Sequence, residues 1–237
     1  NFIRNEFSQK WGSILFSEKY PNTHKELFEV VVAIIDEVIL RSNKDHSYSS
    51  VLVFVPGLLE IETLSEFILT SFGREKTARL LEILQVHSSI LTDDLTRKLH
   101  TLNKDRIKII LATNIAESSI TVMGVKYVID FCLSKEVHFD QKSRMENLEL
   151  IWASQASCRQ RAGRTGRVCD GVVIRLVEHQ FYKKLPDYST PEIQRSSLDR
   201  VILRIKMIHE NTNSEIFAEP GDVLGTAIQP PKLKHID

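Results

Sequence analysis

The sequence lacks three features that would each place a protein in a narrow class. Its 31 Lys and Arg residues balance 31 Asp and Glu residues, so no global positive field exists and any phosphate contact must come from a local cluster. Its three cysteines, Cys132, Cys158 and Cys169, do not have the spacing of metal ligands, which predicts buried thiols in a reducing compartment and no metal site. The most apolar stretch, 27–40, contains three acidic residues, so it predicts an amphipathic helix and not a membrane span.

Short apolar runs alternate with helical patterns along most of the 237 residues. We expect buried strands at 51–55, 83–87, 107–112, 125–131 and 171–177. Helical periodicity indicates helices at 21–40, 58–72, 92–102 and 154–161. Helices between short buried strands predict an α/β fold, in which a parallel sheet is flanked by helices.

The pattern changes in two later parts of the chain. Residues 133–152 mix charged and apolar side chains without helical period, which indicates a protruding hairpin. A long amphipathic helix is expected at 191–208. We therefore divide the chain into a main domain, 1–185, and an extension, 186–237, which is expected to be truncated because it is too short to close a second core.

The most informative segment is 160–167, QRAGRTGR, in which three arginines recur at every third position beside two glycines. Arginine presents a planar, permanently charged fork that suits the oxygens of a transferring phosphoryl group. Glycine lets a partner surface approach the backbone closely. The alternative is a basic helix end that interacts only with the helix dipole and solvent.

A second segment, 111–121, reads LATNIAESSIT, a buried strand that runs into small polar residues. Ligands bind at strand ends of parallel sheets, because the loops there present backbone amides and hydroxyls. The alternative is an ordinary strand-to-turn connection in which Asn114 and Ser118 act as local caps.

These two segments resemble motif VI (QRxGRxGR) and motif V (TNIAETS) of the DEAH subfamily of superfamily 2 helicases. The resemblance covers about 51–204. It implies the second RecA-like domain of an ATP-dependent RNA helicase, a P-loop NTPase fold with a β-hairpin insertion. The segment around 191–196 resembles the start of the winged-helix domain that follows in DEAH proteins.

The resemblance implies a nucleotide-facing set of residues. Arg164 and Arg167 are similar to the arginine fingers that reach the γ-phosphate, and Gln160 to the residue that positions the attacking water. Such fingers contribute on the order of a thousandfold in rate. The residues expected at the ATP site besides these three are Ser119, Thr121, Arg161 and Gly163.

The same resemblance implies contacts with single-stranded RNA. Thr113 and Asn114 are expected to hold RNA phosphates. The run FVPG at 54–57 is similar to motif IV of the family, which implies that Gly57 contacts the RNA backbone. Lys135 aligns with a family lysine near the RNA, although a surface lysine is usually only solvated. Such binding is mainly to phosphate and sugar.

Two positions depart from the family pattern. Leu99 stands where relatives place an aromatic residue that stacks on adenine, and His100 lies beside it. Met123 replaces an acidic residue of motif V that contacts ribose. Both departures imply weaker nucleotide binding, since base stacking and a hydrogen bond would be lost.

Neither a GxxxxGK-Ser/Thr loop nor a DEAH-like acidic quartet occurs in the sequence. Without the amides, lysine and carboxylate that hold phosphates and magnesium, this chain alone is not expected to hydrolyse ATP. The resemblance implies that an upstream RecA-like domain in cis supplies them and holds most of the ATP with Mg²⁺.

Overall likeness, including FAEPGD at 217–222, is greatest to the Tudor-domain-containing members of the piRNA pathway of the spindle-E type. That likeness implies a cytoplasmic protein of perinuclear germ granules, with germ-granule protein partners and no membrane association. Two alternatives stay open. One is a helicase-derived scaffold whose ATP chemistry has weakened, and the other is a DNA-directed helicase of superfamily 2.

Overall fold

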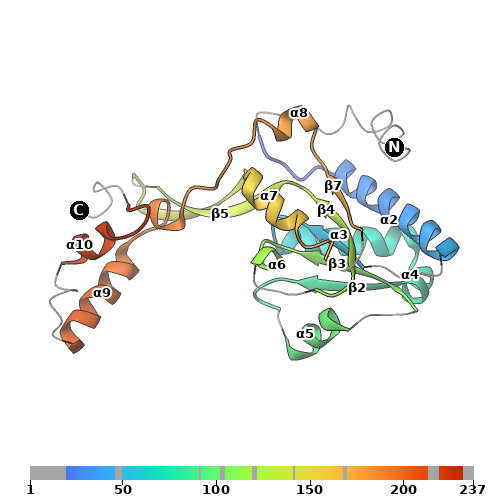
Figure 1. Ribbon diagram of the computed structural model, residues 1–237, viewed down its shortest axis with the longest axis horizontal. Helices are drawn as coiled ribbons and strands as arrows, with labels where there is room; N and C mark the ends of the chain where they lie inside the picture. Colours follow the sequence, from blue (N-terminus) through green and yellow to red (C-terminus); the bar gives the residue numbers. More distant parts are fainter. Residues whose placement is uncertain are drawn as a thin grey trace. The chain divides into compact units, whose positions relative to one another are not determined.

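The computed structural model describes residues 20–45, 50–90, 92–101, 105–118, 122–140, 142–167, 170–212 and 219–231 (Figure 1). Two units are distinguished. The first consists of Asn1–Lys135 and Leu150–Tyr188, and the second of Glu136–Glu149 and Ser189–Asp237. The division falls after Tyr188, and it assigns the outer part of the hairpin to the second unit, whereas the sequence analysis placed all of 1–185 in one domain.

A parallel sheet of five strands, in the order β2-β3-β1-β4-β7, forms the centre of the first unit. The strands are β1 (Ser50–Phe54), β2 (Leu81–Val86), β3 (Ile107–Ala112), β4 (Val125–Asp130) and β7 (Val172–Arg175). Every residue of β1 and β3 is buried. Such nearly continuous apolar runs are typical of parallel strands that helices cover on both faces, as the sequence predicts.

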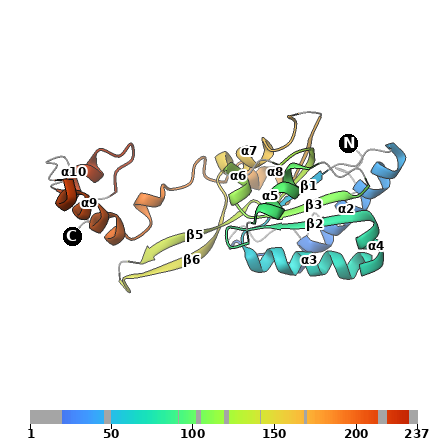
Figure 2. The ribbon, with the colours of Figure 1, turned by 90° about the horizontal axis from the view of Figure 1, so that it is seen from below.

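Helices cover the two faces of this sheet (Figure 2). One face packs against α2 (Lys25–Asp45), α3 (Leu58–Phe72) and α4 (Arg74–Leu80). The other face packs against α5 (Asp93–His100) and α6 (Ile115–Ser118). Alternate residues of β1 enter the two cores, because successive side chains of a strand point to opposite faces: Val51 and Val53 join the first core, and Leu52 and Phe54 the second.

Two further helices follow the hairpin strands β5 (Leu133–Asp140) and β6 (Met145–Trp152) in the chain. They are α7 (Gln155–Ala162) and α8 (His179–Tyr182). They contribute Cys158 and Phe181 to a small third core, where Trp152 and Phe181 meet edge to face with ring centroids 4.8 Å apart. Strands β5 and β6 pair in a two-stranded sheet, so the hairpin predicted at 133–152 is present.

The second unit contains the outer hairpin, a short 3₁₀ helix η1 (Glu192–Gln194), α9 (Asp199–Thr212) and α10 (Pro220–Gly225). The predicted helix at 191–208 is wrong at its start. Arg195 leaves the helical conformation, with φ −126°, and its guanidinium bonds to Glu136 at 3.1 Å and to the Val137 carbonyl at 2.7 Å. The Ser197 hydroxyl then accepts the Asp199 N–H at 3.3 Å, so α9 begins there.

Among the described residues, no helix has both the length and the apolar character needed to span a bilayer.

Candidate functional site

The carboxyl ends of the strands bring together the residues that the sequence assigns to RNA. Phe54 at the end of β1 pairs with Ala112 of β3 and with Asp130 of β4. Thr113 follows β3 directly and Gly57 lies three residues beyond β1. All four strand pairings are parallel, so these ends share one edge of the sheet, which is where ligands bind in open α/β sheets.

Thr113 and Asn114 have different exposures at this edge. Thr113 is buried, and its N–H donates to the Val86 carbonyl at 3.3 Å. The Asn114 side chain is exposed. Their carbonyls accept the N–H groups of Ala116 and Glu117 at 3.1 and 2.9 Å, which begins α6. Asn114 can therefore reach a ligand with its side chain, whereas Thr113 mainly fixes the turn.

Gly57 and Lys135 lie against each other, although 78 positions apart in number. The Lys135 ammonium is 2.9 Å from both carboxylate oxygens of Glu60. A Cβ atom on Gly57 would lie 2.7 Å from the Lys135 Nζ and from the Glu60 Oε2, so a larger residue would displace this ion pair. The sequence analysis missed Glu60; its position in the first turn of α3, three residues after Gly57, was the available signal.

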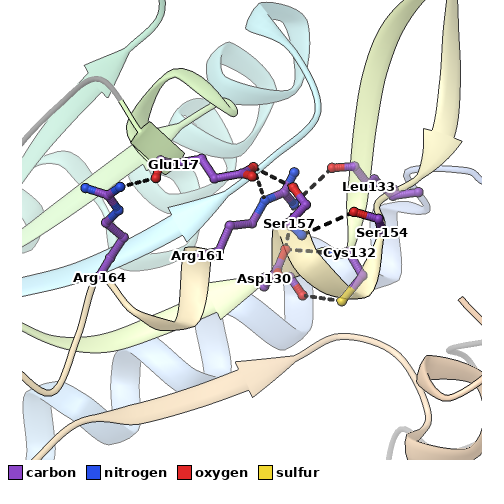
Figure 3. A network of polar contacts seen from close by, with 8 residues as sticks. All are labelled: Glu117, Asp130, Cys132, Leu133, Ser154, Ser157, Arg161 and Arg164. Carbon is purple, nitrogen blue, oxygen red and sulfur yellow. Dashed lines mark hydrogen bonds and ion pairs between the residues drawn. The ribbon is translucent and has the colours of Figure 1, made fainter. Parts of the chain in front are cut away.

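Arg161 is the largest fully buried side chain among the described residues (Figure 3). One guanidinium nitrogen, Nη1, donates to Asp130 Oδ1 at 2.8 Å and to the Leu133 carbonyl at 3.1 Å. Its Nε donates to Glu117 Oε2 at 3.1 Å. The guanidinium carbon also lies 5.3 Å from the centroid of the Phe54 ring.

This burial argues against the predicted contact of Arg161 with ATP. Only 2% of its side chain is exposed, and its Nε and Nη1 groups donate within the domain. Burial alone would lower the pKa of Arg161, but the charges of Asp130 and Glu117 more than offset it, and the pKa is raised. Arg161 is a permanent internal cation that joins α7 to α6 and β4.

Arg164 and Arg167 are more exposed than Arg161. Arg164 is partly buried, and its Nη2 donates to the Glu117 carbonyl (Figure 3). Burial and the nearby charge of Arg167 lower the pKa of Arg164. Arg167 is exposed, and its Nε donates to the Gly163 carbonyl at 3.1 Å. Arg164 and Arg167 thus place two positive charges on one short segment, and an anion bound there would be stabilised by both.

The other residues predicted at the ATP site divide into those that the structure describes and those that it does not. Gln160 and Gly163 are exposed on and just after α7, on the same segment as Arg164. Ser119 and Thr121 lie outside the described residues. The structure thus brings Gln160, Gly163, Arg164 and Arg167 together at the end of one helix.

Thr165 fixes the loop that carries these arginines. Its hydroxyl lies 2.8 Å from the Val125 carbonyl and 3.0 Å from the Lys126 carbonyl, at the start of β4. A Cβ atom on Gly171 would lie 2.2 Å from the Thr165 Oγ1 atom. Gly171 is therefore needed for close approach of the two segments, a role that the sequence analysis did not identify.

Leu99 cannot occupy the position of an adenine-stacking residue. Its side chain is fully buried in the second core. The buried position of Leu99 argues that this departure from the family pattern serves core packing and not nucleotide binding. Met123 is 41% exposed, and its N–H donates to the Leu99 carbonyl at 3.3 Å. Met123 therefore stays a departure from the family pattern at an exposed position.

Three potential metal ligands also lie beside this network. Ligand atoms of Asp130, Cys132 and Cys158 come within 4.8 Å of one another, although the cysteines lack metal spacing in the sequence. Burial, together with Cys158 and Asp130, raises the pKa of Cys132, so its thiol stays protonated. The Arg161 cation already pairs with Asp130. The chemistry favours two packed thiols over a cation site.

Residues 29–169 match the family described as the helicase conserved C-terminal domain. The chain belongs to this family. Its parallel sheet with helices on both faces is the RecA-like fold of these domains, so the predicted fold and the predicted helicase C-terminal domain are confirmed.

Several curated relatives cover most of this chain. The ATP-dependent RNA helicase TDRD9 of Homo sapiens is 37% identical over 230 residues, which are 92% of this chain and 16% of that protein. The probable ATP-dependent RNA helicase spindle-E of Aedes aegypti is 40% identical over 191 residues, covering 79% of this chain and 13% of that protein. The chain thus spans about a sixth or less of the length of these relatives.

A solved structure supports the same fold. The E. coli DExH-box NTPase HrpB superposes with a TM-score of 0.63 at 26% sequence identity, covering 86% of this chain and 25% of that chain.

Proposed function

We propose that this chain is the second RecA-like domain of a DEAH-type ATP-dependent RNA helicase. The observation that carries the proposal is the position of Arg164 and Arg167 just after α7, on a loop that Thr165 fixes to the start of β4. An upstream RecA-like domain in cis would hold ATP with Mg²⁺ and present the γ-phosphate to this pair. The relatives named as ATP-dependent RNA helicases support this activity.

The proposed mechanism is closure and reopening of the two RecA-like domains. In the closed state Arg164 and Arg167 stabilise the charge that develops on the transferring phosphoryl group, and Gln160 orients the attacking water. Asn114, Gly57 and Lys135 hold single-stranded RNA through its phosphates and sugars, so binding is largely independent of sequence. Release of the hydrolysis products reopens the domains and shifts the RNA contacts.

A narrower assignment rests on likeness to the TDRD9 and spindle-E proteins. We propose that the full-length protein acts in germline piRNA silencing, in cytoplasmic germ granules with protein partners there. Immunoprecipitation of the protein from germ cells, followed by sequencing of bound RNA, tests this: absence of piRNA-pathway transcripts would contradict it.

The motor proposal is tested with the full-length protein. Arg167→Ala should abolish RNA-stimulated ATP hydrolysis without changing the thermal unfolding temperature, because Arg167 is exposed. Arg159→Ala is a matched control, since Arg159 is an exposed arginine on α7, the helix that precedes the Arg167 loop. Equal ATPase rates for wild type and Arg167→Ala would refute the finger assignment.

One observation favours a second candidate function. Met123 is exposed where the family pattern has an acidic residue, which is the expectation for a scaffold with weakened ATP chemistry. A wild-type protein that binds RNA but shows no RNA-stimulated ATPase would support this scaffold instead.

A further inference from the structure

Glu117 contacts α7 through its side chain and the turn after α7 through its backbone carbonyl (Figure 3). Its carbonyl oxygen accepts from Arg164 Nη2. Its carboxylate Oε2 accepts the Ser157 hydroxyl at 2.6 Å and Arg161 Nε at 3.1 Å. Ser157 and Arg161 are four positions apart on one face of α7, and Arg164 lies three positions later in the turn that follows the helix. One residue of α6 therefore contacts all three of these side chains.

The carboxylate of Glu117 is suited to hold this face in place. Its side chain is 14% exposed and pairs with Arg161, which is 2% exposed. Charge-assisted hydrogen bonds in such a partly desolvated position are stronger and more restrictive than surface ion pairs. The Arg161 guanidinium is held on its other side by Asp130. Movement of α6 relative to α7 would separate these charges.

Glu117 is also joined to the strand end at which RNA is proposed to bind. Its N–H donates to the Asn114 carbonyl at 2.9 Å, and the preceding N–H, of Ala116, donates to the Thr113 carbonyl at 3.1 Å. Only two residues separate Asn114 from Glu117. A displacement of Asn114 is therefore passed to the Glu117 backbone by a single turn of helix.

We propose that Glu117 is a positioning residue that sets the place of Arg164 and links it to Asn114. This inference rests on the proposed function. In the closed state Arg164 exchanges the Glu117 carbonyl for phosphoryl oxygen, while the Glu117 carboxylate keeps Ser157 and Arg161 in place. RNA bound at Asn114 thereby orders the arginine that ATP hydrolysis needs, which gives a physical route for stimulation by RNA.

The test measures kcat and the KM for ATP of the full-length protein, with and without single-stranded RNA. Glu117→Ala should lower the RNA-stimulated kcat by about tenfold or more, as expected for lost transition-state positioning. The KM for ATP should change by less than about twofold, because most ATP contacts lie in the upstream domain. Glu117→Gln, which keeps an oxygen acceptor for Ser157, should recover part of the loss. Glu178→Ala, an exposed acidic residue outside this network, should match wild type.

A double-mutant cycle separates positioning from general destabilisation. If Glu117 acts through Arg164, adding Glu117→Ala to Arg164→Lys should cause little further loss of kcat in single-turnover measurements. Additive losses, or a Glu117→Ala enzyme that equals the Glu178→Ala control, would overturn the inference.

Two further outcomes keep the test decisive. If Glu117→Ala does not fold, Ser157→Ala replaces it, because it removes one bond to the same carboxylate. Its smaller loss should likewise vanish in the Arg164→Lys background, and an additive loss overturns the inference. If Arg164→Ala leaves ATPase activity intact, the finger assignment itself fails, and with it the proposed function.

Discussion

Asp130, fully buried at the end of β4, accepts a hydrogen bond from the buried guanidinium of Arg161 at 2.8 Å. Removing one member of such a pair leaves an uncompensated charge in the interior, which costs about 3–5 kcal/mol. Arg161→Met should therefore lower the free energy of unfolding by about that amount, measured by urea denaturation.

The control for this prediction is Arg159→Met, at an exposed position of the same helix. It should change stability by less than about 0.5 kcal/mol. An Arg161→Met protein with unchanged stability but weaker ATP binding would restore the original assignment of Arg161 to the nucleotide.

Substitutions of Lys135 and of Glu60 should change the affinity for RNA in opposite directions. If Lys135 contacts a phosphate, Lys135→Ala should weaken binding of single-stranded RNA and reduce the slope of log K against log salt by about 0.7. Glu60→Gln should tighten binding at low salt, because it removes the carboxylate that lies 2.9 Å from the ammonium. Fluorescence anisotropy at several salt concentrations measures both. An unchanged slope for Lys135→Ala would show that the lysine serves only the ion pair.

Leu99 should behave as a core residue. Leu99→Ala leaves a cavity between α5 and the sheet, so the free energy of unfolding should fall by about 2–5 kcal/mol. Base selectivity of the full-length ATPase, compared between ATP and GTP, should stay the same. A change in base selectivity without loss of stability would contradict the buried position.

The hairpin turn should depend on pH through Asp140. The N–H groups of Lys142 and Ser143 and the hydroxyl of Ser143 donate to its carboxylate at 3.0, 3.4 and 2.8 Å, and they lower its pKa. A carboxyl group with a lowered pKa stabilises the folded turn above its ordinary pKa of about 4, and this stability is lost as the pH falls through the lowered value.

Carbon chemical shifts of Asp140 followed by NMR between about pH 2 and 7 measure this pKa. Asp140→Asn should leave the turn insensitive to pH in that range. A midpoint at or above the ordinary value would show that the turn hydrogen bonds are absent in solution.

The sheet could be predicted because its signals are local. Each strand is a short apolar run bounded by polar or glycine-containing segments, and each intervening helix buries one stripe. The start of α9 could not be predicted in the same way. Residues 191–198 have a helical pattern, but Arg195 bonds to Glu136 and Val137, more than 50 positions earlier in the chain. Tertiary contacts there override the local preference.

The candidate site was only partly predictable for the same reason. Three arginines at every third position look equivalent in the sequence, yet Arg161 lies within α7, whereas Arg164 and Arg167 lie in the loop after it. Which of them is buried depends on Glu117 and Asp130, which are 44 and 31 positions away. Without those partners, the pattern identifies the segment but not the role of each arginine.

The connection between β6 and α7, at the base of the hairpin, cannot change in length without displacing α7. Strand β6 ends at Trp152 and α7 begins at Gln155, and the intervening Ala153 N–H donates to the Cys132 carbonyl at 2.8 Å. One residue inserted there would rotate α7 by about 100° and carry Arg164 away from Glu117. Related chains should therefore vary freely in length at the tip of the hairpin, while the two-residue connection at its base stays constant.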